Sequence, residues 1–277
     1  MKFKFCCLAA FALTCIIGCN TPVPQEEMDK SAPSSDIQAA PVAPAEVNPA
    51  PAQENAPPQA PQVGIVHDPM NPPVDCPLRK AGMDPTQMKP FEQIEAYIAF
   101  LEKPDRVLWQ KPNEVVEALN LKGTERILDL GAGSGYFSFP MSQKVPNGRI
   151  FAADVEPEMI RHIHHNAMLK GIQNIEVKLI DAVKPEVPEN IDLVFMCDVM
   201  HHVANPIEWL KGVVAQLPAG ARFALIEFHE GEIPQGPPAS VKMPKAKLME
   251  ITSAAGLTLE REISELLPYQ SFLIFKK

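Results

Sequence analysis

The sequence lacks an excess of basic residues and has few cysteines outside its first segment. Its 277 residues include 25 Lys or Arg and 34 Asp or Glu, for a net charge of −9. Phosphate-rich surfaces repel an acidic chain, which argues against nucleic acid or anionic lipid headgroups as main partners. Only two of the six cysteines, Cys76 and Cys197, follow residue 19. No disulfide framework is expected, and Cys197, within an apolar run, is predicted to be a buried thiol.

The apolar run near the N-terminus is too short to cross a bilayer. It covers the eleven residues 8–18, whereas a spanning helix needs about 20. Lys2 and Lys4 precede it, as is typical of an export signal. We therefore expect residues 1–18 to be a signal peptide.

The end of this signal resembles a bacterial lipobox, in which a cysteine thiol takes a diacylglycerol. Ile16, Ile17 and Gly18 stand before Cys19, so Cys19 is the expected lipidation site. This resemblance implies a protein anchored to a bacterial membrane and facing the periplasm. Asn20 favours the outer membrane under enteric sorting rules. The alternative is an ordinary secretory signal, in which Cys19 has no special role.

Proline is abundant but unevenly placed. Of the 30 prolines, 16 lie between Thr21 and Pro90, among Ala, Gln, Glu, Ser and Asn. Such a composition buries too little apolar surface to offset chain ordering. Residues 19–75 are therefore predicted to form a disordered tether, and residues 76–277 to form the folded domain.

Within that domain the apolar pattern predicts alternating helices and strands. Helices are predicted over 90–101, 112–119, 135–144, 157–170, 206–217 and 244–255. Strands are predicted over 126–130, 149–153, 175–180, 191–197, 221–228, 257–263 and 271–275. Such alternation indicates an α/β fold with a mostly parallel sheet covered on both faces. The last two strands, with no helix between them, indicate a terminal antiparallel pair.

A glycine-rich turn between the first strand and the next helix carries the chemistry. Residues 127–136 read Ile-Leu-Asp-Leu-Gly-Ala-Gly-Ser-Gly-Tyr. Glycines allow a sharp turn and a close approach to a ligand, and a helix N-terminus offers free N–H groups. Asp154 ends the next strand, nineteen residues after Gly135. A carboxylate there can accept both hydroxyls of a ribose.

A dinucleotide-binding domain is the main alternative. Its fingerprint needs glycine or alanine three residues after the second glycine of Gly-x-Gly. That position is Tyr136, which would not allow the required close packing of helix on strand. A tight turn without any ligand is the other alternative.

The segment from Asp129 to Gly135 resembles motif I of class I S-adenosylmethionine (SAM)-dependent methyltransferases. The resemblance covers about residues 111–277 and looks nearest to the quinone-biosynthesis and arsenite-methyltransferase-like branch. It implies a Rossmann-like seven-stranded sheet of order 3-2-1-4-5-7-6. Asp154 matches the ribose-binding acid, Asp181-Ala182 the adenine contact, and Asp198 the acid after strand four. The residues expected to bind SAM are Asp129, Gly131, Ala132, Gly133, Gly135, Tyr136, Asp154, Val155, Asp181, Ala182 and Asp198.

Histidines near the same sheet edge are the candidate bases. His201 and His202 follow Asp198, and histidine titrates in the useful range. The alternative is that one packs beneath the loop and the other is solvated. His162 and His165 share one helix face and are predicted to lie on a solvated surface. Trp109 is either a lid residue or part of the core.

A metal-assisted reaction is a weaker alternative. Asp198, His229 and Glu230 could converge on a divalent ion, as in catechol-type methyltransferases. Those enzymes use an Asp-Asn pair that this chain lacks, so no metal is expected.

The expected function is transfer of a methyl group from SAM to an unidentified small molecule. Because the protein is predicted to be anchored to a membrane, this acceptor could be lipophilic. A non-catalytic, lipid-anchored binder of SAM or a nucleoside is the other reading, because SAM is made in the cytoplasm. The sequence does not indicate an oligomeric state.

Overall fold

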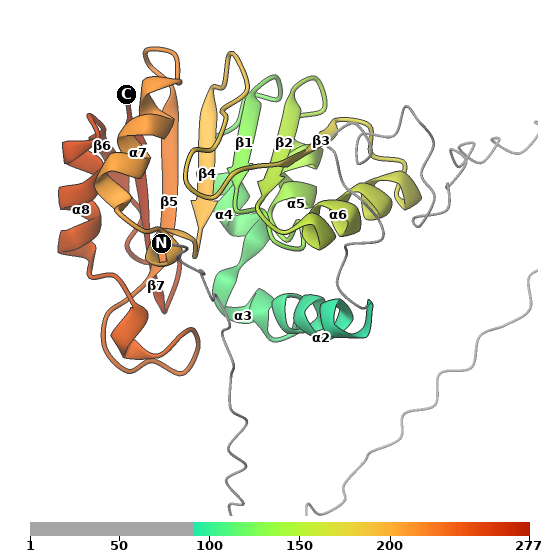
Figure 1. Ribbon diagram of the computed structural model, residues 1–277, viewed down its shortest axis with the longest axis horizontal. Coiled ribbons are helices and arrows are strands. Elements are labelled where there is room, and N and C mark those ends of the chain that lie inside the picture. The colour runs from blue at the N-terminus through green and yellow to red at the C-terminus, as the bar shows by residue number, and fades with distance from the viewer. Residues whose placement is uncertain (1–90) are drawn as a thin grey trace, which may run out of the picture. The chain divides into compact units, whose positions relative to one another are not determined.

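The computed structural model describes residues 91–277 (Figure 1). The predicted signal, Cys19, the tether and Cys76 lie outside these residues. The strands are β1 Arg126–Leu130, β2 Arg149–Asp154, β3 Ile175–Leu179, β4 Leu193–Cys197, β5 Arg222–Phe228, β6 Thr258–Glu262 and β7 Gln270–Lys276. The α-helices are α2 Phe91–Leu101, α3 Arg106–Gln110, α4 Pro112–Ala118, α5 Ser138–Lys144, α6 Pro157–Leu169, α7 Pro206–Ala215 and α8 Lys245–Ala254. Two 3-10 turns, η2 Met200–His202 and η3 Ala239–Val241, complete the list. Among these elements no helix has the length and apolar character needed to cross a membrane.

The strands form one seven-stranded sheet of order β3-β2-β1-β4-β5-β7-β6. β1 to β5 are parallel, and β7 runs antiparallel to both β5 and β6. This order confirms the fold that the methyltransferase resemblance implied. Because the parallel strands end at one edge, the segments that follow β1, β2, β4 and β5 meet there.

Both faces of the sheet are covered, which explains why the central strands are almost wholly apolar. On one face α4 and α5 pack on residues such as Ile127, Phe195 and Phe272. On the other face α7 and α8 pack on Val194 and Leu225. α6 covers the outer strands through a smaller cluster.

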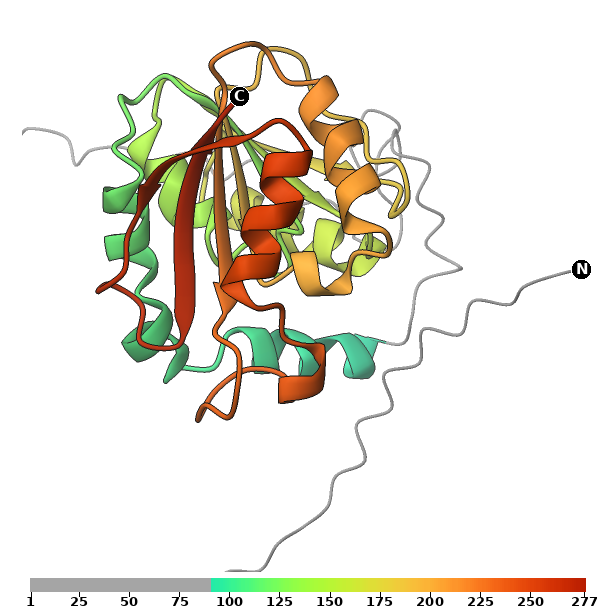
Figure 2. The same ribbon diagram turned by 90° about the vertical axis from the view of Figure 1, so that its left-hand side faces the viewer.

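Two local differences from the predicted elements matter for the site. α5 begins at Ser138 rather than at residue 135, because Gly133 and Gly135 take φ angles of 54° and 86°, outside the helical range. α3 was not predicted. It lies with α2 beneath the carboxyl ends of the strands, as both views show (Figures 1 and 2).

Candidate functional site

The glycine-rich loop after β1 is fastened to the end of β2. The N–H groups of Gly131 and Ala132 both donate to the Ala153 carbonyl, at 2.8 and 2.9 Å. Gly131 has a φ of 81°, and a Cβ there would lie 2.4 Å from a Val199 methyl group. A side chain at this position would therefore push the loop away from the segment after β4.

Asp154 holds the same loop from the side. Its carboxylate accepts the Gly133 N–H at 2.8 Å and the Glu156 N–H at 3.0 Å. Burial raises the pKa of Asp154, although these N–H donors oppose the shift. Val155 follows and is exposed. The sequence thus brings its predicted ribose-binding acid directly against the glycine-rich turn.

Asp129 lies beneath the loop, on β1. It is only 3% exposed, and its carboxylate accepts the Ser138 hydroxyl at 2.5 Å. Burial raises the pKa of Asp129 to about 7, against the Ser138 hydrogen bond and with help from the negative charge of Asp154. A cation bound near these two carboxylates would favour their ionised forms.

Two polar atoms of the loop have no partner among the described residues. They are the buried Ser134 Oγ and Tyr136 hydroxyl. A buried hydroxyl without a hydrogen bond costs about 1–3 kcal/mol, so both favour a polar ligand. The accepting carboxylates beside this loop, together with its polar hydroxyl groups, therefore fit the polar, cationic cofactor implied by motif I.

Helices α2 and α3 cover the loop as a cap. The Arg106 guanidinium lies 4.0 Å from the centroid of the Tyr136 ring and donates to the Leu101 carbonyl and to the Gln110 side chain. Glu102, directly after α2, contacts the His162 ring on α6 at 3.3 Å. The aromatic face expected to meet the cofactor cation is thus covered by an arginine of the chain itself.

This contact corrects one prediction. His162 and His165 are half-buried rather than on a solvated surface, because the cap packs across α6.

Asp198 follows β4 and is held by two glutamines that the sequence analysis missed. The Gln110 amide donates to its carboxylate at 2.9 Å, and the Gln270 amide does so at 2.7 and 2.8 Å. The residue has a φ of 59°, a left-handed conformation that aspartate adopts more readily than most residues other than glycine. Burial, and then the charge of Glu227, raise the pKa of Asp198 to about 6.

The two candidate bases have different surroundings. His201 Nδ1 lies 2.8 Å from a Glu227 carboxylate oxygen, and both side chains are buried. Burial lowers the pKa of His201, but the Glu227 hydrogen bond and charge outweigh it, so the net shift is upward. Burial and the charge of His201 lower the pKa of His202, whose ring lies 4.1 Å from that of His201.

Trp109 packs into an aromatic cluster beside this acidic group. Its ring centroid lies 5.9 Å from that of Phe228 and 6.2 Å from that of Tyr269. The indole N–H is buried without a partner among the described residues. Trp109 therefore joins the cap to the end of β5 and to the residue just before β7.

Asp181 and Ala182 lie on the loop after β3. The exposed Asp181 carboxylate accepts the N–H groups of Val183 and Lys184, and these donors lower its pKa. The Ala182 carbonyl accepts the indole N–H of Trp209 at 2.9 Å. The loop is thus tied to α7 at the edge where Asp154 also lies.

The alternative metal ligands do not meet. His229 and Glu230 line a cavity of about 200 Å³ at the end of β5, whereas the Asp198 carboxylate is bonded to the two glutamines. Within residues 91–277, no group of three or more His, Cys, Asp or Glu side chains is placed to hold a metal ion.

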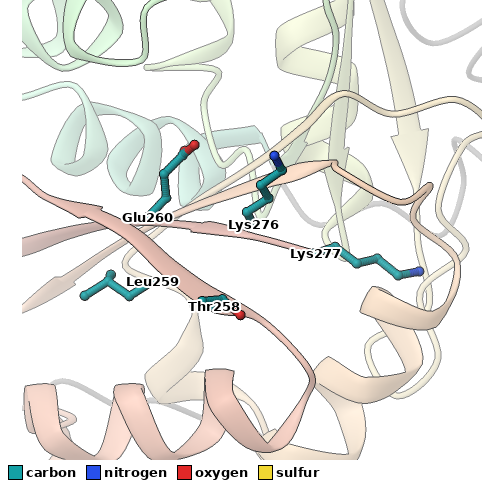
Figure 3. A pocket seen from close by; sticks show the side chains of 5 residues that line it. All are labelled: Thr258, Leu259, Glu260, Lys276 and Lys277. Carbon is teal, nitrogen blue, oxygen red and sulfur yellow. The ribbon is translucent and has the colours of Figure 1, made fainter.

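A second hollow lies far from these residues. It measures about 270 Å³ and is lined by Thr258, Leu259, Glu260, Lys276 and Lys277 (Figure 3). Lys276 pairs with Arg222, at the start of β5, which places the hollow at the opposite edge of the sheet.

Comparison with known proteins identifies the family. Residues 121–269 match the family model described as a methyltransferase domain. The chain belongs to this family. A crystal structure of a SAM-dependent methyltransferase from Aquifex aeolicus is 26% identical, with a TM-score of 0.61, and the match covers 65% of this chain and 96% of that one. The methyltransferase domain of this chain is therefore of the SAM-dependent class.

Curated relatives match over shorter stretches. Aklanonic acid methyltransferase DauC from Streptomyces sp. is 30% identical over 130 residues, 46% of this chain and 59% of the relative. The tRNA U34 carboxymethyltransferase of Desulfotalea psychrophila is 30% identical over 109 residues, 38% of this chain and 33% of the relative. The matched region thus spans less than two thirds of either relative.

Proposed function

We propose that the protein transfers the methyl group of SAM to a small-molecule acceptor. The observation that carries this proposal is the fastening of the Gly131–Gly135 loop by the Asp154 carboxylate above the buried Asp129. That arrangement stands at the carboxyl edge of β1 and β2, where open α/β sheets bind their ligands. Family membership and the Aquifex aeolicus relative support it.

Each part of this edge has a proposed task toward the cofactor. Asp154 accepts the ribose hydroxyls, and the N–H groups of Gly133 to Gly135 approach the polar end of the molecule. Asp181 and Ala182 contact the adenine. Asp198 would face the cation, whereas the Tyr136 ring, which the sequence predicted for the same task, is covered by Arg106. The cofactor itself supplies a methyl group activated by a sulfonium, so the protein's main task is to orient the acceptor.

His201 is the proposed base. Its Nδ1 is held by Glu227 at 2.8 Å, which leaves Nε2 to take a proton from an acceptor hydroxyl. Bound SAM would supply the methyl group to that oxygen and would leave as the neutral thioether, while the proton would stay on His201. A pKa raised from that of free histidine by Glu227 keeps His201 basic enough for this transfer near neutral pH. His202 lacks a comparable carboxylate contact and is the less suitable base.

For the acceptor, we propose a small organic molecule, and a lipophilic one of the quinone type in particular. DauC is named for methylating aklanonic acid, which supports an organic acceptor. The tRNA U34 enzyme acts on tRNA by its name, but the net charge of −9 argues against that substrate here.

We further propose that Cys19 carries lipid and holds the enzyme at a membrane, facing the periplasm. The lipobox-like residues 16–19 support this. Mass spectrometry of the N-terminal peptide from the membrane fraction tests it directly. An acylated Cys19 is the expected result, and a signal cleaved elsewhere or a free thiol would contradict it.

The cofactor is tested by calorimetric titration of SAM into protein made without residues 1–18. We expect micromolar binding that Asp154→Ala abolishes. Asp192→Ala is the matched control, because Asp192 also accepts a backbone N–H, that of Arg126, at the opposite sheet edge. If a folded wild-type protein binds no SAM, the methyltransferase proposal fails. If it binds SAM yet methylates no acceptor in a broad screen, the non-catalytic lipoprotein becomes the better reading.

A further inference from the structure

Large apolar side chains are exposed on the cap that covers the site. Tyr97 and Phe100 on α2 are 50% and 58% exposed, and Val107 and Leu108 on α3 are 49% and 75% exposed. We call these four residues the apolar cap face. They lie within twelve consecutive positions, whereas single exposed apolar residues scattered over a surface need no explanation.

The cap has two different sides. Toward the sheet, Gln110 is fully buried and bonded to Asp198, and Arg106 covers Tyr136. Away from the sheet stand the exposed apolar side chains. Both views place α2 and α3 beneath the carboxyl ends of the strands, with the segment around residues 239–241 at the same edge (Figures 1 and 2). The apolar cap face is therefore at the edge where the acceptor must enter.

The sequence of the cap is close to neutral. Residues 91–111 include four acids, Glu92, Glu95, Glu102 and Asp105, and three bases, Lys103, Arg106 and Lys111. The Lys103 ammonium lies 4.6 Å from the Phe100 ring centroid, so its stem runs along the apolar surface, as at a lipid–water boundary. An apolar face on a segment with no excess of positive charge suits neutral headgroups over nucleic acid or anionic lipid.

The position of the cap in the sequence, shortly after the predicted lipid anchor, would keep it near a membrane. α2 is the first described element and begins at Phe91, and the predicted tether with residues 76–90 places 71 residues between it and Cys19. A flexible chain of this length has an end-to-end distance of about 45 Å, so a lipid on Cys19 would hold the cap close to a bilayer at a high effective concentration.

We infer that the apolar cap face docks on the surface of the membrane that carries the anchor, so that a lipophilic acceptor passes from the bilayer directly to the Asp198 and His201 edge. This inference rests on the proposed function. It adds the orientation of the domain on the membrane and the route by which the acceptor enters.

The test separates docking from anchoring. Protein made without residues 1–18 and carrying Cys19→Ser has no lipid, and it is floated with phosphatidylcholine vesicles on a density gradient. The double variant Phe100→Asp/Leu108→Asp removes the face. Leu169→Asp is the matched control, because Leu169 is 60% exposed at the end of α6, which places it at the opposite edge of the sheet.

We expect the unlipidated protein and the Leu169 variant to float with the vesicles to a similar extent. The cap variant should show a bound fraction at least about tenfold lower, since charged groups replace two membrane-inserted side chains. The inference is overturned if the unlipidated protein stays at the bottom of the gradient, or if the cap variant floats equally well. Loss of a dimer in the cap variant without any vesicle binding would also overturn it. Calorimetric SAM binding, measured on the same samples, reports separately on the cofactor proposal.

Discussion

Replacing Asp129 by asparagine should change how stability depends on pH. Burial raises the pKa of Asp129 from 3.8 to about 7. Between about pH 4 and pH 7 the folded protein therefore holds a proton that the unfolded chain has lost. Its stability falls as pH rises through this range and levels off above it. A shift of this size corresponds to a cost of about 4 kcal/mol at pH 8, most of it absent at pH 4.

The asparagine side chain of the Asp129→Asn variant cannot ionise, so the variant does not lose folding stability through ionisation of a buried group as the pH rises. Its amide N–H groups gain no evident acceptor, which costs about 1–3 kcal/mol at every pH. The informative quantity is therefore the difference in unfolding free energy, variant minus wild type. It should rise by about 2–3 kcal/mol from pH 5 to pH 8.

Urea unfolding at several pH values measures that difference. Ser138→Ala serves as a companion variant, because the Ser138 hydroxyl lowers the pKa of Asp129. Without that hydroxyl the pKa of Asp129 should be higher, so the stability of the Ser138→Ala variant should go on falling to a higher pH than that of the wild type. Parallel pH curves for Asp129→Asn and wild type would refute the reasoning, since they would mean that Asp129 is already ionised in the native protein at pH 5.

Two further outcomes follow from the site. Gly131→Ala should lower the unfolding free energy by about 3 kcal/mol, through overlap with Val199 and backbone strain. Gly171→Ala is the control, because Gly171 has a similar positive φ but open space around it, and it should cost only about 1 kcal/mol. Equal losses of unfolding free energy in urea would contradict this. Glu227→Gln should lower the pKa of His201, because the carboxylate raises it. An NMR titration of the ring protons that finds no decrease would show that Glu227 does not act on this histidine.

Part of the fold was predictable because its signals are local. The alternation of apolar runs located all seven strands within a few residues, and the closely spaced glycines 131, 133 and 135 marked the turn after β1. The strand order came from the resemblance to methyltransferases, since apolar periodicity does not say which strands are neighbours. The start of α5 was misplaced because a Gly-x-Gly turn has no apolar pattern to distinguish it from a first helical turn.

The site was predictable only where residues lie on one continuous segment or end neighbouring strands. The glycine-rich turn and Asp154 met that condition, and the structure brings them into contact. The short helix α3 did not, because five residues carry too little periodicity to identify a helix.

The sequence by itself determined the α/β class and the residues of the glycine-rich turn, because apolar period and glycine content act over a few neighbouring positions. Only the tertiary structure decided that Glu227 selects His201 over the adjacent His202, and that Gln110 and Gln270 enclose Asp198. These partners lie 26 to 88 positions apart along the chain. Burial of their polar groups makes each pairing necessary, and packing of distant segments, rather than local propensity, chooses the partner.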